Sequence, residues 1–142
     1  MRRIVTTIDI AAPPAAVWAV LSDFAAYPDW NPFIRRIVGV PRTGAQLDVT
    51  VKPPNGSEMS FKPTVLKAEP DRELRWLGRV LIPGVFDGEH SFVIEPTATG
   101  CRVAHEEFFW GLLVPFFGRM LDDTEKGFVA ANEALKRRVE AR

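Results

Sequence analysis

The sequence has a single cysteine, two histidines and no net charge. Lys and Arg together number 18, and Asp and Glu also number 18. A nucleic-acid-binding domain normally carries a basic excess, so this balance argues against a nucleic-acid partner. Cys101 has no second cysteine to pair with, which excludes an internal disulfide and fits a reducing compartment.

Long hydrophobic runs are also missing. A membrane-spanning helix needs about 20 apolar residues, whereas the longest apolar stretch, FFWGLLVPFF, covers residues 108–117 and contains Gly111 and Pro115. The N-terminus begins like a signal peptide with MRR, but Asp9 and the Pro13-Pro14 pair break that pattern. We therefore expect a cytoplasmic protein without stable membrane insertion.

Sequence motifs for other chemistry are absent as well. The chain has no phosphate-binding glycine loop, no nucleophile motif and no metal-ligand spacing. The sequence therefore predicts no cofactor and no metal. With 142 residues, and without repeats, linkers or low-complexity tracts, it predicts a single domain over residues 1–142.

Hydrophobic periodicity predicts a strand, a helix, a short helical turn, a run of strands and a long helix. Residues 2–10 alternate as a half-buried strand does, and Pro13 and Pro14 suit the first turn of a helix. From Ile34 onward the pattern is that of strands, with a bulge expected at Pro63. The clearest predicted strands there are 45–51, 57–66, 72–80, 88–96 and 101–109.

Residues 115–142 are predicted to form one long amphipathic helix. Its stripe recurs every three or four residues and comprises Phe117, Leu121, Thr124, Phe128, Ala131, Leu135 and Val139. Such a helix must bury this stripe against the apolar face of a sheet. The fold class is therefore α+β, an antiparallel sheet with its helices on one side.

Two local sequences in this order resemble a known family. IAAPPAAVWAVLSDFAAYPDWNPFI (10–34) and GLLVPFFGRMLDDTEKGFVAANEALKRR (111–138) resemble the polyketide cyclase/dehydrase-like branch of the START-like, or SRPBCC, superfamily. The resemblance implies the helix-grip fold, in which a six- to seven-stranded antiparallel sheet wraps around the long C-terminal helix, with two short helices after the first strand. It also implies a cavity for an aromatic, polyketide-like or lipid-like molecule, and no shared catalytic triad.

Charge pairing suggests a register for the last two strands. If Glu95 lies opposite Arg102, opposite charges meet on the outer face, which stabilises the pairing by a few tenths to about 1 kcal/mol. The inner face then carries the pairs His90 with Glu107 and Phe92 with His105.

A second charge pair extends the register to the preceding strand. If Arg79 lies opposite Glu89, then Trp76 faces Phe92 and Gly78 faces His90. An aromatic floor with a few convergent polar groups is typical of a small-molecule site. The predicted ligand-binding residues are Trp76, Gly78, His90, Phe92, His105, Glu107, Phe109, Phe117, Met120, Thr124 and Phe128.

Three functions remain open from the sequence. In the first, the protein binds a hydrophobic small molecule, and a His90–Glu107 pair either anchors a polar group of that ligand or is structural. In the second, it is a cyclase/dehydrase-type enzyme without a cofactor, in which His90 and Glu107 move a proton. In the third, the apolar corners at 80–88 and 108–117 meet a protein partner or a membrane instead of covering the mouth of the cavity.

Overall fold

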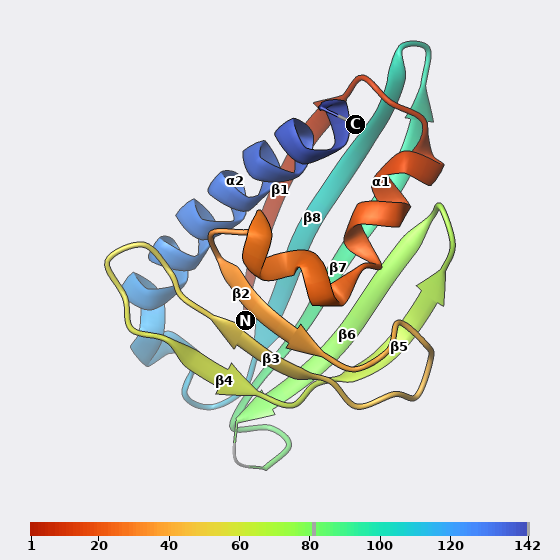
Figure 1. Cartoon of the computed structure of the whole chain (residues 1–142). Helices are drawn as coiled ribbons and strands as arrows, with labels where there is room; N and C mark the ends of the chain where they lie inside the picture. Colours follow the sequence, from red (N-terminus) through yellow and green to blue (C-terminus); the bar gives the residue numbers. More distant parts are fainter. Residues whose placement is uncertain (81, 142) are drawn as a thin grey trace.

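The computed structural model of the chain describes residues 1–80 and 82–141 (Figure 1). Position 81, in the predicted corner 80–88, and position 142, at the end of the predicted helix, lie outside them. The elements are β1 (Arg2–Ile10), α1 (Pro14–Leu21), η1 (Phe24–Asp29), β2 (Ile34–Val38), β3 (Asp48–Val51), β4 (Met59–Phe61), β5 (Thr64–Glu69), β6 (Glu73–Val80), β7 (Phe86–Thr97), β8 (Gly100–Trp110), η2 (Val114–Phe117) and α2 (Gly118–Glu140), where η denotes a 3-10 helix.

The strands form two antiparallel sheets, and α2 lies along one face of the larger sheet (Figure 1). The larger sheet has the order β1-β8-β7-β6-β5 and the smaller one β2-β3-β4, and a bridge between Gln46 and Thr64 joins them. Figure 1 shows the smaller sheet crossing one end of the larger one. This arrangement confirms the helix-grip fold, with eight strands in two sheets among the described residues 1–80 and 82–141, where six or seven in one sheet were expected. The predicted strand 57–66 is two strands, which meet at Pro63, a residue with no N–H to donate.

Helix α2 runs along the larger sheet for nearly its full length. Its 23 residues span about 35 Å, which is close to the roughly 40 Å of the 12-residue strand β7. The predicted stripe is buried from Leu121 to Val139. Phe117 was predicted to begin this stripe but is 40% exposed. Residues 114–117 form the 3-10 helix η2, and the α-helix begins only at Gly118.

The core lies between the larger sheet and α2. Trp76, Phe92 and Val103 from the sheet and Phe128 from the helix are all buried in one hydrophobic cluster. Their shared interior confirms the alternation read from the strands and the period read from the helix. Tyr27 of η1 is buried in the same cluster, where its hydroxyl donates to the carbonyl of Leu21 at 2.7 Å.

The predicted register is correct between β7 and β8. Glu95 lies opposite Arg102, and His90 opposite Glu107. Between β6 and β7 the predicted register is wrong by two residues. Trp76 lies opposite His90, not Phe92, and Gly78 lies opposite Gly88. A two-residue shift keeps every side chain on its predicted face, because side chains alternate with period two.

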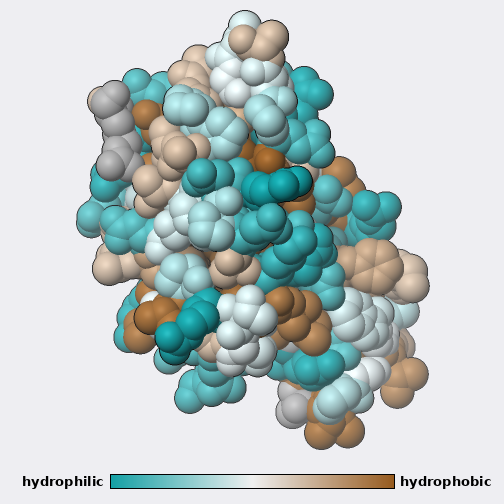
Figure 2. Space-filling view, turned by 90° about the vertical axis from the view of Figure 1, so that its right-hand side faces the viewer, coloured by the Kyte–Doolittle hydropathy of each residue, from teal (hydrophilic) through white to brown (hydrophobic). Residues whose placement is uncertain are grey.

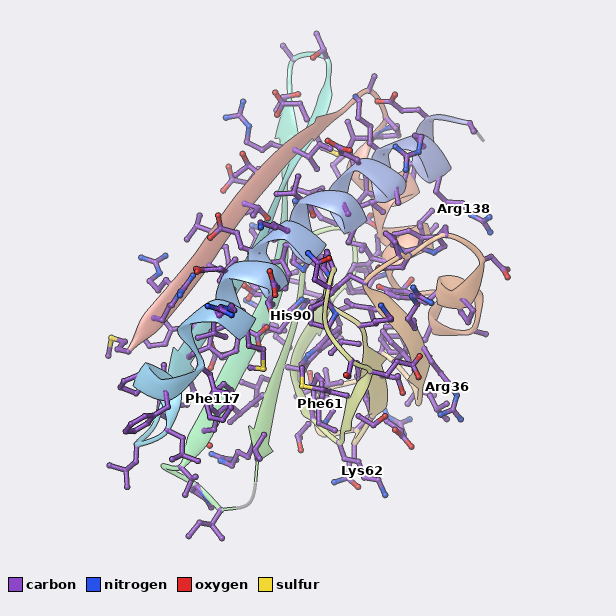
Figure 3. All side chains as sticks on the ribbon, turned by 90° about the vertical axis from the view of Figure 1, so that its left-hand side faces the viewer. Arg36, Phe61, Lys62, His90, Phe117 and Arg138 are labelled. Carbon is purple, nitrogen blue, oxygen red and sulfur yellow. The ribbon has the colours of Figure 1, made fainter. Side chains whose placement is uncertain are left out.

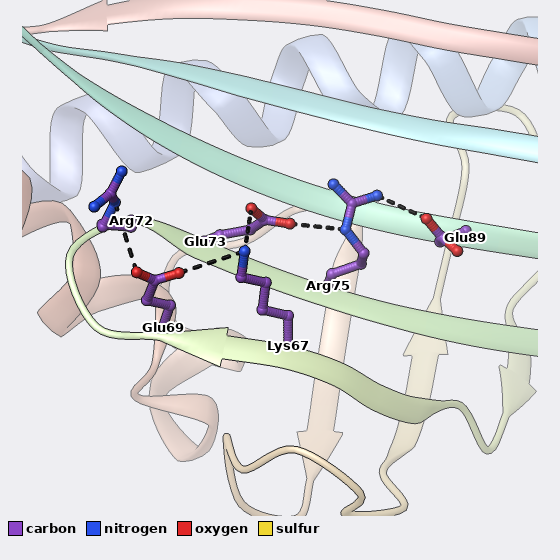
Figure 4. Close-up of polar contacts among 6 residues, drawn as sticks. All are labelled: Lys67, Glu69, Arg72, Glu73, Arg75 and Glu89. Atoms are coloured by element: carbon purple, nitrogen blue, oxygen red, sulfur yellow. Dashed lines mark hydrogen bonds and ion pairs between the residues drawn. The ribbon is translucent and has the colours of Figure 1, made fainter.

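Charge pairing could not decide this register because two registers satisfy it. Arg79 faces Asp87, with 3.7 Å between Nε and Oδ2, and Glu89 pairs diagonally with Arg75 at 2.7 Å. Arg75 also binds Glu73 at 2.8 Å, within a network of ion pairs on the outer face of β5, β6 and β7 (Figure 4). Partly exposed pairs of this kind contribute about 0–1 kcal/mol each, so the buried inner face fixes the register.

Candidate functional site

A cavity of about 440 Å³ lies between the two sheets and the first half of α2. This volume falls within the roughly 300–1,000 Å³ of small-molecule sites. Its wall is mostly aliphatic and aromatic. The lining residues are Phe33, Ile34, Val51, Met59, Ser60, Phe61, Trp76, Gly78, Arg79, Val80, Phe86, Gly88, His90, Glu107, Phe109, Met120, Leu121 and Thr124.

Two facing glycines make room in the wall. Gly78 lies opposite Gly88 on adjacent strands. A Cβ atom at Gly88 would lie 2.5 Å from Oε2 of Glu107, and one at Gly78 would lie 3.1 Å from the ring of Phe61. Larger residues at these positions would displace the Glu107 carboxyl group and the Phe61 ring. The ring comes from the smaller sheet, on the opposite side of the cavity from β7 and His90 (Figure 3).

Seven of the eleven residues predicted to contact a ligand line this cavity. They are Trp76, Gly78, His90, Glu107, Phe109, Met120 and Thr124. Phe92, His105 and Phe128 are buried but lie beside the cavity. His105 stacks between the other two rings, with centroids 4.3 Å from Phe92 and 3.9 Å from Phe128. These three rings fill space that the sequence had assigned to the cavity. Phe117 lies outside the wall and packs edge-on against Phe86.

The sequence missed the opposite wall of the cavity. That wall comes from the smaller sheet and includes Ile34, Val51, Met59 and Phe61. Alternation in 57–66 placed Met59 and Phe61 on one face. However, it did not show which face looks inward, since that depends on how the smaller sheet folds over the larger one.

His90 belongs to a chain of buried and partly buried hydrogen bonds. Its Nε2 lies 2.7 Å from Nε2 of His105, and Nδ1 of His105 lies 2.8 Å from Oδ1 of Asn132 on α2. Nδ2 of Asn132 donates to Oγ1 of Thr6 at 2.8 Å, and that hydroxyl donates to the backbone carbonyl of His105 at 2.7 Å. His90 and Glu107 therefore do not form the predicted hydrogen-bonded pair. The two residues face each other across the strands, but the Nε2 hydrogen bond of His90 goes diagonally to His105.

Burial shifts the three titrating groups of this region toward their neutral forms. It lowers the pKa of His105 to about 3, and the hydrogen bond to Asn132 opposes this only in part. Burial, with smaller contributions from the charges of His105 and Arg75, holds the pKa of His90 well below its usual value. Burial also raises the pKa of Glu107 to about 8. Near neutral pH both imidazoles are uncharged, and much of the Glu107 population is protonated.

The two apolar corners form one structure at the end of the cavity. Backbone N–H groups of Leu112 and Leu113 donate to the carbonyls of Gly84 and Val85, each at 3.0 Å. Phe86, a cavity residue, contacts the rings of Phe109 and Phe117. Several apolar side chains of these corners remain exposed, and Figure 2 shows hydrophobic surface toward the lower end of the molecule. They are Val80, Ile82, Leu112, Leu113, Phe116 and Phe117.

The sequence matches one family over residues 1–140, described as polyketide cyclase / dehydrase and lipid transport. The chain belongs to this family. The match confirms the resemblance that the sequence motifs suggested. No curated protein matches the chain.

Several solved structures have the same fold as this chain. The Zhui aromatase/cyclase from a Streptomyces species has a TM-score of 0.80 at 19% identity, over 99% of this chain and 94% of that one. A START superfamily protein from Mycobacterium smegmatis has a TM-score of 0.76 at 23% identity, over 98% and 97%. Protein MLL2253 from Mesorhizobium loti has a TM-score of 0.78 at 20% identity, over 99% and 98%. At these identities the likeness shows the fold alone.

Two further properties bear on the type of site. Within residues 1–80 and 82–141, no helix is long and apolar enough to cross a membrane. In the same part of the chain, no cluster of three or more His, Cys, Asp or Glu side chains is arranged to hold a metal ion.

Proposed function

We propose that the protein binds an apolar, ring-containing small molecule in the cavity between its two sheets and α2. The observation that carries the proposal is a cavity of about 440 Å³ with a mainly apolar wall and few polar groups, among them His90 and Glu107. Membership of a family described by polyketide cyclases, dehydrases and lipid transport supports a polyketide-like or lipid-like ligand.

The aromatic part of the wall is held in place before any ligand enters. The ring of Trp76 stacks on His90 with centroids 4.4 Å apart and planes 10° apart, and it meets Phe92 edge-on at 6.2 Å. Its packing leaves the indole little rotameric freedom to lose on binding. A fixed apolar surface of this kind favours a flat aromatic ligand, because the entropy cost of ordering the site is small.

The binding proposal can be tested with N-phenyl-1-naphthylamine, an uncharged probe whose fluorescence rises in apolar cavities. We expect saturable binding to the wild-type protein. Met120→Trp should abolish it by filling the cavity from α2. Val129→Trp is the matched control, because Val129 is on the same helix but 45% exposed and away from the cavity wall. Equal binding by both variants, with both folded, would contradict the proposal.

A second pair of variants separates cavity wall from ordinary core. Trp76 and Phe92 are both 2% exposed, but only Trp76 lines the cavity. Replacing either with Ala should lower the free energy of unfolding by about 3–5 kcal/mol. Probe affinity should change strongly only in Trp76→Ala. Equal changes in affinity would mean that the probe reports loosened packing and not the cavity.

Acid–base catalysis is the second candidate function. His90 and Glu107 face each other across β7 and β8 and both line the cavity. A carboxyl group with a pKa of about 8 can donate a proton near neutral pH, and a neutral imidazole can accept one. Polyketide-like substrates carry acidic protons between two carbonyls, which such a pair can exchange.

A β-diketone with a naphthyl group, 1-(2-naphthyl)butane-1,3-dione, tests this second function. We expect the protein to accelerate exchange of its central C–H protons with D₂O, followed by NMR. Glu107→Gln should bind the diketone but reduce the accelerated rate by about 100-fold or more. Exchange at the uncatalysed rate in the wild-type protein would rule out this function and leave the binding function in place.

A further inference from the structure

The chain of hydrogen bonds behind His90 has only one possible direction. It begins at the backbone carbonyl of His105, which can only accept, so the hydroxyl of Thr6 must donate to it. The Thr6 oxygen then accepts from the amide nitrogen of Asn132, which leaves the Asn132 oxygen to accept from Nδ1–H of His105. Each group in this part of the chain has a single role.

The same direction continues to His90. Both imidazoles are neutral near neutral pH, since burial lowers the pKa of each. Because Nδ1 of His105 carries that ring's proton, its Nε2 can only accept, and it accepts from Nε2–H of His90 at 2.7 Å. Nδ1 of His90 is then left as a bare lone pair. The tautomers of both histidines thus follow from one backbone carbonyl.

That lone pair has no partner in the described part of the chain. Nδ1 of His90 is buried and accepts no hydrogen bond from residues 1–80 or 82–141. The ring cannot easily turn to find one, because it stacks on Trp76 at 4.4 Å and meets the edges of Phe92 and Phe128 at 4.8 and 5.4 Å. His90 also lines the cavity. A molecule inside the cavity is therefore the natural source of the missing donor.

We propose that the ligand carries a hydrogen-bond donor, the hydroxyl of a phenol or enol, which it gives to Nδ1 of His90. Thr6, Asn132 and His105 are positioning residues that keep this nitrogen an acceptor. The inference rests on the proposed binding function and narrows it to hydroxylated ring compounds. Pairing an otherwise unsatisfied buried acceptor strengthens binding by roughly tenfold to a hundredfold.

Histidine NMR tests the direction of the chain in the free protein. The sequence contains only two histidines, so a long-range ¹H–¹⁵N spectrum shows two rings, assigned by the loss of one in His90→Phe. We expect His105 to be protonated at Nδ1 and His90 at Nε2. Adding 2-naphthol should shift the bare nitrogen of His90, and 2-methoxynaphthalene should not. Two rings of the same tautomer, or a protonated Nδ1 on His90, would overturn the inference.

A matched pair of ligands tests the consequence. 2-Naphthol and 2-methoxynaphthalene share a ring system, but only the first has a donor. Each is measured by displacement of N-phenyl-1-naphthylamine. We expect 2-naphthol to bind at least tenfold more tightly, although the ether is the more apolar molecule. His90→Phe, which keeps a flat ring without an acceptor, should remove this preference.

Asn132→Asp should remove the preference. A carboxylate beside Nδ1 of His105 favours the charged imidazole, which then donates from Nε2 to His90 and moves the His90 proton to Nδ1. The oxygens of 2-naphthol and 2-methoxynaphthalene can both accept from this Nδ1–H, so the two compounds should then bind with similar affinity, and NMR should show the changed tautomer. A merely structural Asn132 would change stability and leave the ratio of the two affinities unaltered, and that result would refute its positioning role.

The outcomes separate this inference from the binding function. If N-phenyl-1-naphthylamine binds but the two naphthalenes displace it equally, the donor proposal fails and the binding function stands. If the probe does not bind at all, the binding function fails, and the NMR experiment still decides the direction of the hydrogen-bond chain.

Discussion

Replacing Gly127, in the middle of α2, with Ala has two effects of opposite sign on the free energy of unfolding. Replacing a glycine in a helix interior with Ala normally stabilises a protein by about 1 kcal/mol. Here the new Cβ would lie 2.5 Å from Cδ1 of Phe33 and 3.0 Å from both Cε1 and Cγ of the same ring. Carbon atoms in contact prefer about 3.5–4.0 Å, so the ring would have to move by roughly 1 Å.

The Phe33 ring can yield only toward the cavity that it lines. It is buried and packs edge-on against Phe128 at 5.5 Å. Since the close contacts include Cγ, rotation about the Cβ–Cγ bond does not relieve them. Overpacking of this kind costs about 1–3 kcal/mol. After subtraction of the helix-propensity gain, we expect Gly127→Ala to lower the free energy of unfolding by up to about 2 kcal/mol.

Urea and thermal denaturation measure this change. A loss of about 2 kcal/mol, the upper end of this range, lowers the Tm of a domain of this size by roughly 4–8 °C. Gly118→Ala is the matched control, because a Cβ there meets only a distant atom of Arg2 at 4.0 Å, and it should be neutral or slightly stabilising. Phe33→Leu in the Gly127→Ala background should recover part of the loss through coupling of the two sites. A raised Tm in Gly127→Ala would refute the packing argument.

Three further predictions concern the cavity and its surroundings. Because the folded-state pKa of Glu107 is raised to about 8 from 4.5, its stabilising contribution is complete below pH 4.5 and is lost as pH rises toward 8. The slope of the free energy of unfolding against pH is at most about 1.4 kcal/mol per pH unit for one group, and it is smaller here because Glu107 is only half-buried. Glu107→Gln should remove this slope, and parallel unfolding profiles of the two proteins against pH would contradict the prediction. Oδ1 of buried Asn31 accepts from the N–H groups of Phe33 and Ile34 at 2.9 and 2.8 Å, so Asn31→Ala should lose about 1–3 kcal/mol in urea unfolding, with Asn31→Asp as the control that keeps the acceptor. Phe116 is 79% exposed, so Phe116→Ser should change stability by no more than about 0.5 kcal/mol yet alter the release rate of N-phenyl-1-naphthylamine in stopped-flow measurements; a large fall in Tm at an unchanged rate would show that the corner is ordinary core.

The sequence by itself determined the order of the elements and which face of each strand is buried. Alternation in residues 72–80 and 88–96 placed Trp76, His90 and Phe92 inside, and the structure agrees. The stripe of α2 from Leu121 to Val139 was equally clear. These properties are local: each strand or helix must bury one face whatever its neighbour is, so periodicity alone reveals that face.

Only the tertiary structure decided which inner residues meet. A two-residue shift between β6 and β7 preserved every face and satisfied the charges equally well, so the stacking of Trp76 on His90 could not be read from the sequence. Likewise, His90 and Glu107 were correctly placed opposite each other, but the partner of His90 is His105, one diagonal away. Register depends on how whole inner surfaces pack, and that packing is a property of several segments together.

The cavity itself is the clearest case of tertiary control. Its second wall comes from β2, β3 and β4, and its volume depends on how far that small sheet stands from Gly78 and Gly88. The direction of the hydrogen bonds at His90 is set by Thr6 and Asn132, which lie near opposite ends of the chain. Sequence periodicity reports which side chains avoid water, whereas distances between side chains remote in sequence exist only after the chain has folded.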